Sequence, residues 1–142
     1  MNKKLWKLIW FGVPFTKVVY AYLAYTSRKE IDNSFQILNL LILLIGILTC
    51  TISILISRKI YKKSFYDNKI VKTMMGTQKN ADDSSTIFYL YTIMLGLAES
   101  AALFGFVQYI ITGNLIVGII LYAFSLLAWA FNYPSVKEED EQ

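Results

Sequence analysis

Residues 35–56 read FQILNLLILLIGILTCTISILI, a run of 22 residues that contains no charged side chain. A helix needs about 20 mostly apolar residues to cross the hydrocarbon core of a bilayer. The run is far longer than an ordinary strand, and charged segments lie on both sides of it. It therefore predicts a transmembrane helix, and this segment sets the fold class expected for the whole chain.

Three other apolar runs have the length of a membrane span, and they predict helices at about residues 5–25, 87–111 and 115–133. A short polar turn, Thr112-Gly113-Asn114, joins the last two runs and forces an antiparallel hairpin. We therefore expect an all-α integral membrane bundle of about four transmembrane helices, which forms one domain over residues 1–142.

The first run is the least regular of the four, because it contains Pro14 and Lys17. Proline has no backbone N–H, so one helical carbonyl needs another donor, either from a neighbouring helix or from the Thr16 hydroxyl. A signal peptide and an interfacial helix are the alternatives. The signal peptide is disfavoured because its apolar stretch is short and residues 21–23, Ala-Tyr-Leu, make a poor cleavage site. The prediction is an uncleaved span.

The basic residues indicate an orientation. With four spans, eleven Lys and Arg residues fall on the side that holds both termini, and only two fall on the other side. Cytoplasmic segments carry the excess of basic residues, so both termini are expected in the cytoplasm of a cell whose inner membrane holds the protein. Aromatic residues mark the predicted span ends: Trp6, Trp10, Trp129 and Tyr133 at the inner interface, and Tyr20, Tyr22 and Tyr25 at the outer one.

The loop at 57–83 is basic and also contains large apolar side chains. We interpret it as a helical extension of the second span that lies near anionic lipid headgroups, which attract each basic residue by about 1 kcal/mol. Because topology explains the basic residues, nucleic-acid binding is not expected. The acidic tail at 137–142 is expected to be a solvated end without fixed structure.

The composition disfavours enzymatic chemistry. The chain has no histidine, and its one cysteine, Cys50, lies inside an apolar run. It has no thiol cluster, no paired intramembrane acids and no phosphate-cradling glycine loop. We therefore expect no enzyme activity, no metal and no cofactor.

Glu99 is the residue on which the functional prediction depends. It lies twelve residues from either end of the 87–111 span. A charged side chain at this depth costs roughly 2.5–3.5 kcal/mol, so it is expected to be paired, protonated or turned toward protein or water. The first hypothesis is a homo-oligomeric membrane protein in which Glu99 binds a proton or cation. The other candidate residues of that site are Ser100, Thr49 and Ser53.

Small residues around Glu99 predict close helix packing, because they let two backbones approach. At about 100° per residue, Ala98, Ala101, Ala102 and Gly105 fall within one arc of about 100°, and Glu99 borders it. On the second span, Asn39, Gly46, Cys50 and Ser53 share a face by the same spacing, which offers a partner surface. The residues assigned to helix packing are Gly96, Ala98, Ala101, Ala102, Gly105 and Gly46.

Lys17 is the second deep charge, about 12 Å from the outer end of its span. Two arrangements are compatible with the sequence. Lys17 extends to the outer interface among the tyrosines, or it forms an ion pair with Glu99 across the bundle. The pair gives the second hypothesis, a structural or accessory membrane subunit in which Glu99 contacts Lys17 or a partner protein.

The stretch LGLAESAALFGF at 95–106 resembles the carboxylate-bearing helix of rotary ATPase ring proteolipids, which are subunit c of ATP synthases and its vacuolar-type relatives. In that family a mid-membrane carboxylate among Ala and Gly binds the transported proton or sodium ion. The resemblance implies that Glu99 is the ion carboxylate, that Ser100 and Ala102 are its neighbours, and that Gly105 is a packing residue.

The resemblance covers twelve residues, and the rest of the chain departs from the family. The second span contains only Gly46, where ring proteolipids carry a glycine-rich helix. The span with Glu99 opens a hairpin, whereas in duplicated proteolipids it closes one. The overall layout is similar to that of small uncharacterised bacterial four-span membrane proteins.

Overall fold

The computed structural model describes residues 3–27, 30–34, 36–60, 62–74 and 83–134, and all regular structure in these ranges is helical. The all-α prediction is therefore confirmed for this part of the chain. The acidic tail at 137–142 and residues 75–82 of the basic loop lie outside the described residues. The helices are α1 (Lys3–Thr26), α2 (Ile37–Lys59), α3 (Lys63–Tyr66), α4 (Lys69–Met74), α5 (Asp83–Thr112) and α6 (Leu115–Phe131).

Three of these helices, α1, α2 and α5, are long and apolar enough to cross a membrane, and α6 is a shorter apolar helix of 17 residues. That length is at the lower limit for a span. The sequence predicted a span at about 115–133, and the helix ends two residues before that limit. α6 ends at Phe131 because Asn132 closes its last turn and because Pro134 disfavours a helical backbone at Tyr133.

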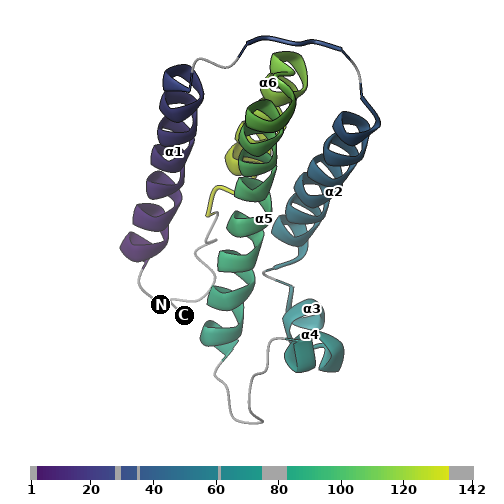
Figure 1. Ribbon diagram of the computed structural model, residues 1–142. Coiled ribbons are helices and arrows are strands. Elements are labelled where there is room, and N and C mark those ends of the chain that lie inside the picture. The colour runs from purple at the N-terminus through teal and green to yellow at the C-terminus, as the bar shows by residue number, and fades with distance from the viewer. Residues whose placement is uncertain (1–2, 28–29, 35, 61, 75–82, 135–142) are drawn as a thin grey trace.

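The four long helices form a bundle (Figure 1) in which α1 and α2 lie on opposite sides of the α5–α6 pair. α5 contacts each of the other three long helices, and α2 also packs against α6. We call the end of the bundle where Trp10 meets Trp129 the tryptophan end, and the opposite end, with the α5–α6 turn at 112–114, the turn end. Consecutive long helices alternate in direction between these two ends.

Small residues set the close contacts among α2, α5 and α6. Ala98, Ala101 and Ala102 are fully buried. A Cβ on Gly105 would lie only 3.0 Å from the Gly118 carbonyl oxygen, and one on Gly46 would lie 2.3 Å from Leu121 Cδ2. These helices therefore approach too closely for larger side chains, as membrane helices commonly do. The predicted α2 face is also confirmed, since its buried residues are Asn39, Gly46, Cys50 and Ser53.

Gly96 does not pack against another helix, and the packing role assigned to it was wrong within this chain. It is exposed, and a Cβ built on it would meet no atom within 4 Å. The reason lies in helical geometry: at about 100° per residue, Gly96 is about 160° around α5 from Ala98. Its proximity in sequence to the alanines did not place it on their face.

α1 packs through a single stripe of side chains and runs in the same direction as α5. The least exposed positions along it recur with alternating steps of four and three residues, which is the spacing of one helix face. Trp6 contacts Phe88 edge to face with ring centroids 5.9 Å apart, and Tyr20 stacks on Phe106 at 5.7 Å. The stripe consists of Trp6, Trp10, Val13, Lys17, Tyr20 and Ala24.

The turn end is fastened by backbone groups. Gly113 adopts φ +73°, a left-handed conformation that favours glycine, and its carbonyl accepts a hydrogen bond from the Asp32 N–H at 3.0 Å. The Ser34 carbonyl accepts side-chain amide hydrogen bonds from Asn39 and Asn114, each at 3.2 Å. The Ser34 N–H donates to Asp32 Oδ1 at 2.9 Å, and this bond lowers the pKa of that carboxyl.

The basic loop is not a continuous extension of α2, so that interpretation was wrong. α2 ends at Lys59, and the chain then forms two short helices, α3 and α4. Ile60 is 1% exposed, and Phe65 and Val71 pack with it against the tryptophan end of the bundle. The break allows these apolar side chains to turn back onto α1 and α5.

Candidate functional site

The two deep charges of the chain meet between α1 and α5. The Lys17 ammonium forms an ion pair with Glu99 Oε2. Lys17 is 1% exposed, whereas the side chain of Glu99 is 18% exposed. The structure thus places Lys17 inside the bundle and not among the tyrosines of the turn end.

The pairing follows from the register of two parallel helices. Trp6 lies beside Phe88, and the offset of 82 residues between them also separates Lys17 from Glu99. Lys17 follows Trp6 by eleven residues, and Glu99 follows Phe88 by eleven residues. Eleven residues make about three helical turns, so Lys17 and Glu99 return to the faces on which the two helices contact each other. Lys17 occupies a position of the α1 stripe where an apolar residue would be expected, and a charge there requires a partner.

Thr16 supplies a second contact to the same carboxyl group. Its hydroxyl lies within hydrogen-bonding distance of Glu99 Oε1 and also of the Val13 carbonyl, at 2.6 Å from the latter. A hydroxyl carries one proton, so it donates to only one of these oxygens at a time. Each oxygen of Glu99 therefore has a polar partner on α1.

The other residues predicted for this site do not hydrogen-bond to Glu99. The Ser100 hydroxyl donates to the Leu97 carbonyl at 2.8 Å, and the Thr49 hydroxyl donates to Gly46 at 2.9 Å. Ser53 donates to the Met94 carbonyl at 2.7 Å. The structure therefore brings together Lys17 and Glu99 but not Thr49, Ser53 and Ser100, which are bound to backbone carbonyls.

Polar side chains link the remaining helices in the same way. Ser125 of α6 donates to the Ala98 carbonyl of α5 at 2.6 Å. The Asn132 amide donates to Ser53 Oγ at 2.7 Å, and the Gln108 amide donates to Asn39 Oδ1 at 2.9 Å. Such bonds join apolar helices that gain little from hydrophobic contact with each other in lipid. These hydrogen bonds join uncharged groups, whereas the contact between Glu99 and Lys17 joins two charges.

A pair of tryptophans fastens α1 to α6 at the tryptophan end. The Trp10 and Trp129 rings stack with centroids 4.1 Å apart and an interplanar angle of 14°. Each indole N–H donates to the backbone carbonyl of the other residue at 2.9 Å. In a regular helix the N–H of residue 14 would donate to the carbonyl of Trp10. Pro14 has no N–H, so this carbonyl lacks its helical donor. A neighbouring helix thus supplies the missing hydrogen bond.

Trp10 and Trp129 were expected at a membrane interface, and Trp6 with them. The structure places Trp6 and Trp10 in the protein interior, at 2% and 9% exposure. The position of Pro14 is the signal that could have identified the indole contact, since it singles out the carbonyl at residue 10. Thr16 carried no comparable signal for its contact with Glu99.

The part of the chain that the structure describes holds no group of three His, Cys, Asp or Glu residues that could bind a metal. Comparisons with known proteins add no assignment: no protein-family model, no curated protein and no solved structure matches this chain.

Proposed function

We propose that this chain is a structural or accessory multi-pass membrane protein in which the Lys17–Glu99 pair fastens α1 to the rest of the bundle. The observation that carries the proposal is that both oxygens of Glu99 face polar donors of α1 and that Lys17 is 1% exposed. A cation would have to displace these groups. Two opposite charges also neutralise each other, which makes a charged site tolerable in an apolar bundle.

The proposal includes four spans with both termini on the cytoplasmic side of the inner membrane. Its support is the length and composition of the long helices and the excess of basic residues on one side of the chain. Exposed lysines and arginines near the tryptophan end, such as Arg58 and Lys62, would lie near anionic headgroups. No catalytic role is included.

Proton or cation binding by Glu99, in a homo-oligomer, is the second candidate. The observation that favours it is the partial exposure of the carboxyl, 18% against 1% for its partner. A carboxyl group that is partly exposed can bind a proton or cation while the protein stays folded.

Proton flux into reconstituted vesicles separates the two candidates. We expect the wild type to match protein-free vesicles, and Glu99→Gln to leave flux unchanged, because the carboxyl is engaged by α1. Glu30→Gln, which removes the same charge from an exposed residue outside the helices, is the matched control. A wild-type flux above the protein-free rate that Glu99→Gln abolishes and Glu30→Gln retains would refute the structural role.

A further inference from the structure

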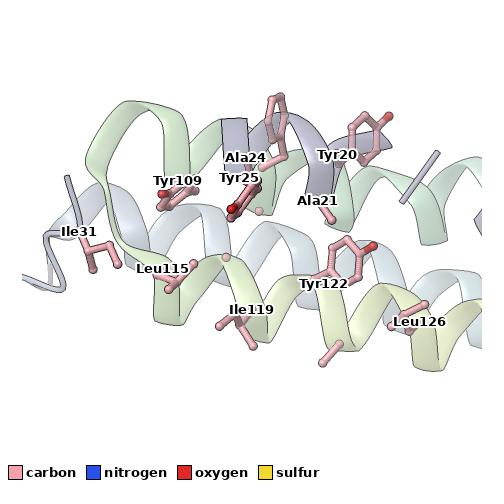
Figure 2. A pocket seen from close by; sticks show the side chains of 14 residues that line it. Tyr20, Ala21, Ala24, Tyr25, Ile31, Tyr109, Leu115, Ile119, Tyr122 and Leu126 are labelled. Carbon is pink, nitrogen blue, oxygen red and sulfur yellow. The ribbon is translucent and has the colours of Figure 1, made fainter. Parts of the chain in front are cut away.

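A cavity of about 660 Å³ lies between the second half of α1 and the α5–α6 pair. Its volume is in the range of about 300–1,000 Å³ that is usual for small-molecule sites. Figure 2 shows Tyr20, Ala21 and Ala24 of α1 across from Ile119 and Tyr122 of α6. The lining side chains are apolar or aromatic throughout. We call this space the α1–α6 groove.

The two ends of the groove lie at different depths. One end is lined by Tyr25, Ile31 and Leu115 at the turn end, and the other by Tyr20, Tyr122 and Leu126. The second end is close to the ion pair, because Tyr20 follows Lys17 by three residues, about one helical turn, on the same face of α1. The groove therefore runs from the end of the helices to the level of the Lys17–Glu99 pair.

The length of the groove matches one leaflet of a bilayer. Leu115 and Leu126 are eleven residues apart, which is about 16 Å along α6. Half of the hydrocarbon core of a bilayer is about 15 Å thick. If the headgroup of a lipid lies at the turn end, the end of its acyl chain would reach the depth of the Lys17–Glu99 pair.

The groove is too narrow to enclose a whole helix. A volume of about 660 Å³ over about 16 Å corresponds to a mean cross-section of roughly 40 Å². A helix with side chains is about 10–12 Å in diameter and needs roughly twice that area or more. A helix from a second copy of the chain would not fit inside the groove, whereas extended hydrocarbon chains fit within it.

From these observations we infer that the α1–α6 groove binds one membrane lipid, with its acyl chains along α6 and its headgroup at the turn end, beside Ile31. The groove is continuous with the exposed apolar surface of the bundle, through Ile119 and Tyr25, which are 59% and 83% exposed. The inference goes beyond the structural role of the ion pair and does not require it.

Photocrosslinking tests this site. The protein is reconstituted in phosphatidylcholine vesicles in which a small fraction of the lipid carries a diazirine on one acyl chain. After illumination and digestion, mass spectrometry maps the adducts. We expect adducts on the groove residues of α1 and α6 to exceed those on the exposed face of α2 at least fivefold. Ala24→Trp and Ile119→Trp, which fill the groove from opposite walls, should each reduce them at least fivefold.

Leu44→Trp is the matched control, because Leu44 is 55% exposed on α2 and does not line the groove. It should leave the groove adducts unchanged. Adducts distributed over α2 and the groove in proportion to exposure would overturn the inference. Unchanged adducts in both filling variants, or crosslinks from the groove to a second copy of the chain, would overturn it as well. Ile119 is already exposed, so its substitution tests the site even where Ala24→Trp fails to fold.

Discussion

Glu99→Met should lower the free energy of unfolding in detergent by about 3–5 kcal/mol, which is the usual cost of removing one partner of a buried ion pair. The loss arises because Lys17 is 1% exposed and is left without its partner carboxyl group. Glu99→Gln should cost less, since its amide oxygen still accepts a hydrogen bond from the ammonium group. Equilibrium unfolding in mixed micelles, followed by tryptophan fluorescence, measures these differences.

The double variant Lys17→Met with Glu99→Met provides the control. Replacing both charges with apolar side chains of similar size removes the desolvation cost of each, so the double variant should be close to the wild type in stability. The coupling energy between the two substitutions should then be several kcal/mol. If the two single losses simply add, the residues do not interact in the folded protein and the pair is absent.

Trp129→Phe should lower the free energy of unfolding by about 1–3 kcal/mol, because it leaves the buried Trp10 carbonyl without a donor. In the Pro14→Ala background the residue at position 14 has an N–H that can reach the same carbonyl four residues back. The cost of Trp129→Phe should then fall to that of the altered ring stacking, about 0.5–1.5 kcal/mol. Thermal unfolding of the four variants measures this dependence.

Trp6→Phe is the control for this cycle. Trp6 is also buried and packs against Phe88 and Tyr91, but the structure records no hydrogen bond of its indole within the described residues. Its cost should be the same in the wild-type and Pro14→Ala backgrounds. A Trp129→Phe cost that is independent of residue 14 would show that the indole does not serve the carbonyl that proline frees.

The helices were predictable because their signal is local. A charge-free run such as 35–56 has no stable alternative to a helix in lipid, since every backbone group must be bonded internally. The helix ends were less predictable. α5 begins at Asp83, four residues before the predicted span, because a membrane helix can continue through polar residues once it leaves the apolar run. α6 ended early because of Asn132 and Pro134.

The neighbours of each helix were harder to predict than the helices. The spacing of Ala98, Ala101 and Ala102 identified a packing face, and the small residues of the second span were correctly offered as its partner surface. The same spacing gave no indication of where α1 would lie. The sequence therefore left Lys17 with two arrangements. The choice depends on α1 lying beside α5 in a parallel register, and that register is set by aromatic contacts such as Trp6 with Phe88 and Tyr20 with Phe106.

The hydrogen-bond partners of Thr49, Ser53 and Ser100 were not predictable for a related reason. A hydroxyl on a membrane helix can bond to its own backbone, to a neighbouring helix or to a carboxyl, and sequence spacing does not distinguish these outcomes. In the structure Ser53 bonds to Met94, and the other two bond within their own helices. Which of these partners each hydroxyl takes is decided by the tertiary structure.

Solid-state NMR of the protein in lipid bilayers can measure the distance between Lys17 and Glu99. The dipolar coupling between the Lys17 side-chain nitrogen, labelled with ¹⁵N, and the Glu99 carboxyl carbon, labelled with ¹³C, reports their separation. The ion pair predicts a strong coupling, because charge-assisted N···O contacts are about 2.7–2.9 Å long. The absence of any measurable coupling in a folded sample would show that the two charges are apart and that α1 is not fastened to α5 by an ion pair.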